Sequence, residues 1–379
     1  MNEGLTDDQV ALRATVREVA EGEIAPVAEE LDREGRFPYA IVAILGELGL
    51  MGMTVPEELG GAGLDTLSYA IAIEELARVD SAVAVTVAAH TGLGTMPIVL
   101  YGTPEQRERW VPDLASGRAL GAFGLTEPEA GSDAGATRTR ATPRDGGWRI
   151  DGSKMFITNA GTDITACCTV TALTGDGEIS AFIVPADAPG YRPDAPLRKI
   201  GWRASDTRPV TLDGVEVGPE ALLGPRGAGL RQALSALDGG RIAIAAMGVG
   251  LAQGAFELAL RHARERRQFG RAIVGFQAVQ FSLAEMAAEI TAARCLLYHA
   301  ARVKDSGGNA TGVAAMAKLT AGRLAQTVAE RSLHLHGGYG WMEESPISRL
   351  YRDAKILEIG EGTSEVQKMV IARAVGAHE

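Results

Sequence analysis

Cysteine and aromatic residues are scarce in this chain of 379 residues, which has three Cys and only 5% Phe, Trp and Tyr. Cys167 and Cys168 are adjacent and Cys295 stands alone, so their spacing argues against a disulfide framework and matches no common metal site. This cysteine usage is typical of a reducing cytoplasm. We expect no bound metal.

The sequence also lacks a basic leader, a long apolar run and an excess of positive charge. It begins with the acidic stretch MNEGLTDDQV, unlike a secretory signal. Its longest run of low charge, residues 242–256, is too short and too rich in Gly and Ala to predict a membrane span. The net charge of −11 argues against a general nucleic-acid or membrane surface. We therefore expect a cytoplasmic protein without membrane insertion or nucleic-acid binding.

The chain is long enough for two or three packed units, and its residue pattern changes twice. Apolar residues recur at helical spacing from Thr6 to about residue 117, and Thr6 before two aspartates predicts a helix start. Short β-branched runs follow, separated by Asp-Gly pairs at 145–146, 176–177 and 213–214. Helical patterns then return over 230–266, 276–305, 311–335 and 364–375.

These patterns predict an α+β fold without the βαβ alternation of nucleotide-binding domains. We expect an N-terminal helical domain (1–120), a middle domain with an antiparallel β-sheet or small barrel (121–226), and a C-terminal four-helix bundle (227–379).

The stretch EIGEGTSEV, residues 358–366, places a carboxylate, Glu361, between Gly360 and Gly362. Glycines mark turns and helix ends, and an acid at the start of the helix expected from Ser364 would favourably meet its dipole. Alternatively, the glycines let a large or flat group approach the carboxylate, as a catalytic base requires. The stretch alone leaves both interpretations open.

Two stretches of the expected β domain carry polar groups suited to a heterocycle or a phosphate. FGLTEPEAGSD, residues 123–133, combines hydroxyls and glycine-exposed backbone N–H groups, although it also fits an ordinary turn. KMFITNA, residues 154–160, sets an aromatic beside polar residues and equally fits a half-buried strand.

Two further stretches lie in the helical last third. RERRQFGRAIVGFQAVQ, residues 264–280, is the one dense basic stretch, and we expect a helix to end there at Gly270. Its arginines are suited to bidentate contact with a phosphate. The alternative is that they form the solvated face of a helix. HLHGGYGW, residues 334–341, supplies glycines between helices. Its two histidines have a poor spacing for a metal.

Together, in this order and at these separations, the five stretches resemble the acyl-CoA dehydrogenase family of flavoproteins over essentially the whole chain. The resemblance implies that family's helical, β, helical architecture and an FAD between the β domain and the C-terminal bundle. The implied isoalloxazine contacts are Phe123, Leu125, Thr126, Ser132, Phe156, Ile157 and Thr158, with Thr363 and Ser364 beside the base. The implied contacts with the pyrophosphate and adenosine of a neighbouring subunit's FAD are Arg266, Gln268, Phe269, Gln277, His334, Gly337 and Gly338.

The resemblance further implies that Glu361 is the base that removes the α-proton of an acyl thioester while a hydride leaves the β-carbon for flavin N5. Ser132 would lie near the pantetheine, Asp238 and Arg241 would border the CoA moiety, and Gly362 would keep one side of the base open. Some relatives carry the base just before the arginine of LDGGR, where this sequence has Gly240.

Two residues depart from the family pattern. Gly360 replaces the aromatic that often precedes the base, which would lighten the pocket wall, and His334 replaces a glutamine.

The resemblance leaves several functions open. The leading one is dehydrogenation of an acyl-CoA with electrons passing to an electron-transferring flavoprotein, in a homo-oligomer, either a tetramer or a dimer. The acyl group could instead be bound as a thioester to a carrier protein of polyketide or peptide biosynthesis. A flavin monooxygenase or oxidase, or a non-catalytic flavoprotein, are the other candidates.

Overall fold

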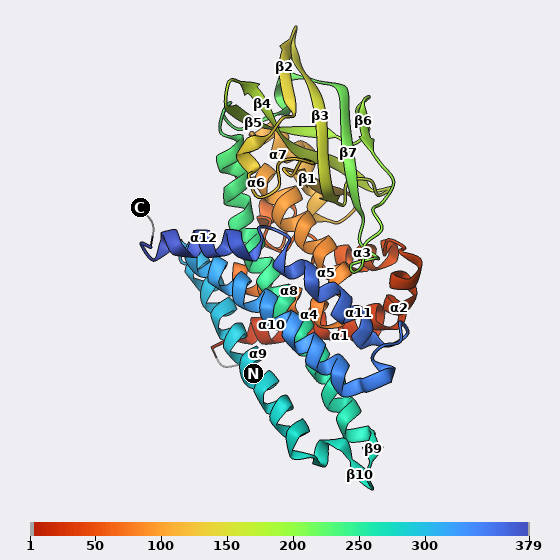
Figure 1. Cartoon of the computed structure of the whole chain (residues 1–379). Helices are drawn as coiled ribbons and strands as arrows, with labels where there is room; N and C mark the ends of the chain where they lie inside the picture. The colour runs from red at the N-terminus through yellow and green to blue at the C-terminus, as the bar shows by residue number, and fades with distance from the viewer. Residues whose placement is uncertain (1–3, 378–379) are drawn as a thin grey trace.

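The computed structural model describes residues 4–377, and along the chain helices come before and after the main β-sheet, which lies at one end of the molecule (Figure 1). Thr6 caps the first helix: its hydroxyl oxygen accepts a hydrogen bond from the Gln9 backbone N–H at 3.2 Å, and the Gln9 side-chain oxygen accepts one from the Thr6 backbone N–H at 3.2 Å. This pair of hydrogen bonds is a capping box. This confirms the expected helix start. The N-terminal helices are α1 Asp7–Val19, α2 Ala25–Glu34, α3 Tyr39–Glu47, α4 Thr66–Val79, α5 Ser81–Ala88, α6 Met96–Tyr101 and α7 Pro104–Ala115, with π-helical turns η1 Ala20–Ile24 and η3 Ala89–Thr95.

The middle region forms the expected β domain as an eight-stranded sheet. Most strand pairs are antiparallel, but β1 and β2 each pair with β4 in parallel, so the sheet is mixed and not antiparallel throughout. The segment between β1 and β4, which contains the β2–β3 hairpin, supplies the long connection that a parallel pair requires. Residues 154–158 of the KMFITNA stretch form the second part of strand β3. The strands are β1 Leu120–Gly124, β2 Arg140–Arg144, β3 Gly147–Thr158, β4 Thr165–Gly175, β5 Glu178–Pro185, β6 Tyr191–Pro193, β7 Thr207–Val217 and β8 Leu222–Leu223.

One of the three predicted Asp-Gly turns lies inside a strand instead. The pair Asp213-Gly214 belongs to β7, where Gly214 has φ +64° and the register against β3 shifts between Ile150 and Gly152. A glycine in the left-handed region accommodates such a bulge, so the same residue pair that closes hairpins elsewhere only bends this strand.

The C-terminal region contains the four predicted helices and one that the sequence pattern did not reveal, α11. Helix α8 is central and packs against α4, α9 and α10. Its glycines allow this: a Cβ on Gly250 would lie 2.1 Å from the Glu74 carbonyl oxygen of α4. The helices are α8 Gly229–Glu265, α9 Gln277–Asp305, α10 Thr311–His336, α11 Pro346–Ala354 and α12 Ser364–Ala374, with 3₁₀ turns η7 Gly337–Tyr339 and η8 Lys355–Glu358 before α11 and α12.

Two helical stretches, Ser81–Tyr101 and Gly229–Glu265, are long and apolar enough to cross a membrane by length and composition alone. The argument that residues 242–256 are too short is therefore wrong, because α8 extends beyond that run on both sides. In each stretch 78% of the apolar window is buried inside the protein, as in the core helices of a folded domain.

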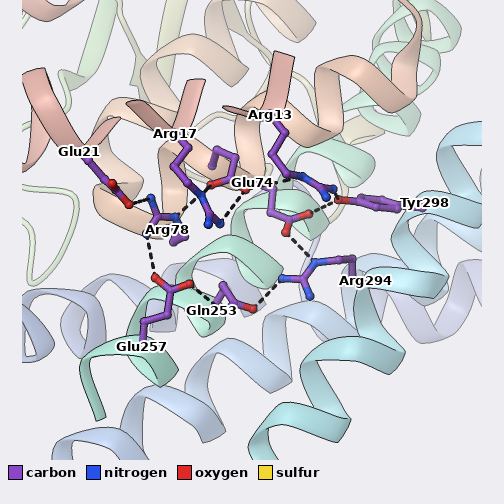
Figure 2. A network of polar contacts seen from close by, with 10 residues as sticks. Arg13, Arg17, Glu21, Glu74, Arg78, Gln253, Glu257, Arg294 and Tyr298 are labelled. Atoms are coloured by element: carbon purple, nitrogen blue, oxygen red, sulfur yellow. Dashed lines mark hydrogen bonds and ion pairs between the residues drawn. The ribbon is translucent and has the colours of Figure 1, made fainter. Parts of the chain in front are cut away.

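A buried polar network joins α1, α4, α8 and α9 (Figure 2). Its centre is the pair of neighbouring acids on α4, Glu74 and Glu75, with side chains 5% and 3% exposed. Removing the basic partner of a buried acid leaves that acid with an uncompensated charge, which costs about 3–5 kcal/mol of folding free energy. The network thus ties the first helix to the bundle. Its contacts are Glu75 with Arg17 and Arg78 (both 3.0 Å), Arg78 with Glu257 (2.8 Å) and Glu21 (2.6 Å), and Glu74 with Arg294 (2.7 Å) and Tyr298 (2.8 Å).

Candidate active site

Glu361 lies in the turn between η8 and α12, in a backbone conformation that few non-glycine residues adopt. Its φ is +53° and that of Gly362 is +93°. Thr363 follows as the N-cap of α12, and its side chain accepts the Val366 N–H at 3.3 Å. The turn therefore starts the helix and also sets the direction of the Glu361 side chain, so the two interpretations of this stretch are compatible.

The Glu361 side chain points at the backbone of α8. Its Oε2 atom is buried and has no hydrogen-bond partner among the described residues. A Cβ built on Gly240 would lie 1.7 Å from this oxygen, so the carboxylate occupies the space that the glycine leaves. Burial raises the pKa of Glu361 to about 7, against the opposing effect of the Lys318 and Arg241 charges. A half-buried carboxyl group with one oxygen shielded from water and a pKa near neutral is suited to accept a proton.

The two glycines beside Glu361 differ in their surroundings. A Cβ on Gly362 would lie 2.7 Å from Nε2 of Gln367, which belongs to the following helix. Together with its φ of +93°, this shows that the turn itself favours glycine at 362, and the expectation that Gly362 also keeps one side of the base open stays a prediction. A Cβ on Gly360 would meet no atom closer than 3.5 Å, so the missing aromatic does leave room there.

The LDGGR stretch lies in the first half of α8, beside the carboxylate. Arg241 is 6% exposed, its guanidinium is paired with Asp238, and its Nε is buried without a partner among the described residues. Asp238 also accepts the Thr311 hydroxyl at 2.9 Å. The tertiary structure thus places Asp238, Gly240 and Arg241 near Glu361, although more than a hundred residues separate them in sequence.

The FGLTEPEAGSD loop is anchored by a buried ion pair. Lys154, on β3, is 0% exposed and donates to Glu127 Oε1 at 2.8 Å, while Glu127 accepts the Thr139 hydroxyl at 2.6 Å. The sequence pattern gave no sign of this pair. Around the anchor, Ser132 is exposed, Phe123 and Thr126 are half-buried, and Leu125 is buried.

Phe156 interrupts β3 with an exposed ring. It is 64% exposed at φ +61°, and the register against β7 shifts between Lys154 and Ile157. A large apolar side chain held outward at strained backbone is a candidate contact for a flat ligand. Ile157 instead packs in the sheet core at 2% exposure, so only its backbone could face a ligand, whereas Thr158 is half-buried.

The basic stretch forms a small hairpin and not the end of a helix at Gly270. Helix α8 ends at Glu265, and strands β9 Arg267–Gln268 and β10 Arg271–Ala272 pair around Phe269-Gly270. Phe269 is 92% exposed with φ +50°. Phe269 and Gly270, at the tip of the hairpin, both have positive φ, which an α-helix does not contain. The helix therefore ends before these residues, at Glu265, and not at Gly270.

Part of the basic stretch and part of the HLHGGYGW stretch line one open pocket of about 520 Å³. A Cβ on Gly337 or Gly338 would meet no atom within 4 Å, so the backbone there is accessible. The sequence missed His262, whose ring stacks at 4.4 Å on that of His336 from the predicted loop 334–338. The predicted His334, Phe269 and Gln277 are exposed but do not line the pocket. The lining residues are His262, Arg266, Gln268, Ile273, Leu335, His336, Gly337, Gly338, Tyr339 and Met342.

No group of three or more His, Cys, Asp or Glu side chains able to hold a metal ion occurs in residues 4–377. The three cysteines are free.

Three family models cover most of the chain: the N-terminal domain of acyl-CoA dehydrogenase over residues 6–118, the middle domain over 122–215 and the C-terminal domain over 227–376. The probable acyl-CoA dehydrogenase YngJ of Bacillus subtilis is 48% identical over 98% of this chain and 99% of its own. The short-chain specific acyl-CoA dehydrogenase of Clostridium acetobutylicum is 44% identical over 98% of this chain and 99% of its own.

Solved structures agree with these matches. Butyryl-CoA dehydrogenase from Megasphaera elsdenii superposes with a TM-score of 0.95 at 39% identity, covering 99% of this chain and 100% of that one. A chain in a structure that concerns the electron transferring flavoprotein of Acidaminococcus fermentans gives 0.96 at 41%, covering 99% of both. A glutaryl-CoA dehydrogenase of Mycobacterium smegmatis in complex with FADH2 gives 0.94 at 32%, covering 99% and 96%. The chain belongs to the acyl-CoA dehydrogenase family and is an oxidoreductase of that class.

Proposed function

We propose that this enzyme uses Glu361 to remove the α-proton of an acyl-CoA thioester while a hydride leaves the β-carbon, which gives the trans-2-enoyl thioester. The carrying observation is the buried, unpartnered Oε2 of Glu361 in the space left by Gly240. Bound FAD would supply the hydride acceptor at its N5 atom. A thioester α-proton is weakly acidic, so it needs a dry carboxylate held in a fixed direction.

The described residues fit an FAD in two separate groups. The strained, exposed Phe156 and the anchored 123–133 loop would hold the isoalloxazine ring, with Thr363 and Ser364 near the base. The pocket beside the β9–β10 hairpin would hold the pyrophosphate and adenosine through Arg266, Gln268 and the open glycines.

Figure 1 supports a shared site, because the β domain and the β9–β10 hairpin lie at opposite ends of the molecule. One molecule therefore does not bring both groups to one cofactor, and a second copy would contribute the hairpin. We infer a homo-oligomer, a dimer or tetramer, located in the cytoplasm.

The similarity to butyryl-CoA and short-chain specific dehydrogenases favours short acyl-CoAs as substrates, and the space beside Gly360 would admit a bulkier or branched acyl group. A solved structure that concerns an electron transferring flavoprotein supports such a protein as the electron acceptor. The carrier-protein alternative has one specific support: the prolyl acyl carrier protein oxidase AnaB superposes with a TM-score of 0.94 at 30% identity, covering 98% of this chain and 100% of that one. Acyl-CoA and acyl-carrier-protein thioesters carry the same phosphopantetheine arm, so an experiment has to distinguish the two substrates.

The test is anaerobic mixing of the purified protein with acyl-CoAs and matching acyl-carrier proteins while the flavin absorbance is followed. We expect short-chain acyl-CoAs to bleach the flavin. Bleaching by carrier-bound substrates alone would favour the assembly-line function, and a flavin that no thioester reduces would contradict dehydrogenation.

Arg266→Ala should weaken FAD retention without changing the chemistry of flavin that stays bound. Arg266 is exposed in the pocket, so its loss removes a phosphate contact and leaves the core unchanged. The measurement is the ratio of flavin to protein after extensive dilution, and Arg33→Ala, an exposed arginine of α2, serves as the control. Stoichiometric FAD in Arg266→Ala would rule out the phosphate assignment.

A further inference from the structure

A buried lysine lies directly beneath the turn that carries Glu361. Lys318, on α10, is 1% exposed, and its Nζ donates to the Gly362 carbonyl oxygen at 2.6 Å. Burying an ammonium group in an otherwise Ala-rich helix is costly unless its charge is used. A neutral donor also satisfies a carbonyl oxygen, although a charged donor forms the stronger bond, so this hydrogen bond alone does not explain a buried cation here.

A neutral donor does reach the same carbonyl. Nε2 of Gln367, which is fully buried on α12, donates to Gly362 O at 3.0 Å and to Glu361 O at 3.2 Å. Lys318 and Gln367 therefore hold the carbonyls of two consecutive residues with left-handed φ. Such backbone persists only where its surroundings fix it, so these donors set the direction in which Glu361 leaves the turn.

The charge of Lys318 is free to act on Glu361. None of the carboxylates in residues 4–377 forms an ion pair with Lys318, whereas Arg241, the other cation facing Glu361, is already paired with Asp238. The remaining titratable group that faces the carboxylate is the Tyr69 hydroxyl on α4.

Burial lowers the pKa of Lys318 to about 8, so the side chain is still protonated at neutral pH. The negative charge of Glu361 raises the pKa of Lys318 most, followed by that of Glu358 and then Glu365. The positive charge of Arg241 lowers the pKa of Lys318. The coupling is mutual, since the Lys318 charge lowers the pKa of Glu361 against the effect of burial.

We propose that Lys318 is a positioning residue for the dehydrogenation: it fixes the turn that presents Glu361, and its positive charge favours the ionised form of that carboxylate. The inference rests on the proposed role of Glu361. Lys318 does not reach the substrate in this scheme, because its ammonium group is bound to the backbone beneath the turn.

Lys318→Met tests the charge, because methionine fills a similar volume without it. Loss of the cation removes a stabiliser of the ionised carboxylate, so the pKa of Glu361 rises. The acidic limb of the kcat/KM profile should move to higher pH by about one unit. Lys318→Arg should retain the wild-type limb, and Gln367→Met, which removes a neutral donor to the same carbonyl, should lower kcat without moving the limb.

A readout independent of turnover separates this inference from the function itself. The infrared band of the protonated Glu361 carboxyl, identified by its loss in Glu361→Gln, should titrate at higher pH in Lys318→Met. An unchanged titration in folded Lys318→Met would overturn the inference, and Lys318→Gln provides a second neutral variant if the methionine variant does not fold. Rapid dehydrogenation by Glu361→Gln would instead overturn the proposed base while leaving the band titration as a valid test of the coupling.

Discussion

Glu361→Gln is expected to keep bound, yellow FAD and to lose dehydrogenation by on the order of a thousandfold or more. The amide has nearly the same shape as the carboxyl group, so the turn and its backbone hydrogen bonds remain, but it cannot accept the α-proton. The measurement is the rate of flavin reduction by a saturating acyl-CoA in anaerobic stopped flow.

Glu365→Gln is the matched control, since Glu365 is an exposed acid in the first turn of α12. It should reduce the flavin at the wild-type rate. A Glu361→Gln enzyme that turns over near the wild-type rate would remove Glu361 from its role. The measured substrate affinity of the same variant shows whether the amide also weakens binding.

Gly240→Ala is expected to cost about a hundredfold in flavin reduction without loss of stability. The new methyl would lie 1.7 Å from Glu361 Oε2, so the carboxylate must move. Because this oxygen is the far end of a flexible side chain, the movement costs little folding free energy, and alanine is favoured over glycine inside a helix by about 1 kcal/mol. Activity and stability should therefore change in opposite directions.

The neighbouring glycine provides the control for this prediction. Gly239→Ala makes the same change in the same helix, and its methyl would meet only the terminal Nζ of Lys304, at 2.9 Å. It should gain similar stability and keep its activity. Stability is measured by thermal unfolding of the flavin-loaded protein, and activity by flavin reduction as above. Equal activity in the two alanine variants would show that the space at Gly240 does not matter for the carboxylate.

The sequence predicted the fold class and most helices because their signals are local. The capping box at Thr6, the periodic apolar positions of α8, α9 and α10 and the turn pairs at 145–146 and 176–177 each depend on residues close together in the chain. Where pairing partners are distant the prediction failed: the parallel β1–β4 pair and the bulge at Gly214 depend on which strands meet, which no local pattern records.

The same distinction between local and distant contacts holds for the candidate site. Resemblance to a family singled out Glu361, and the glycines around it revealed an unusual turn, both from one short stretch of sequence. Only the tertiary structure decided that Gly240 makes room for the carboxylate, that Gly362 serves the turn, and that Lys318 lies beneath it. These are contacts between α8, α10 and the 359–363 turn, and whether a lysine in an Ala-rich helix is a solvated charge or a buried one depends on the packing of all three.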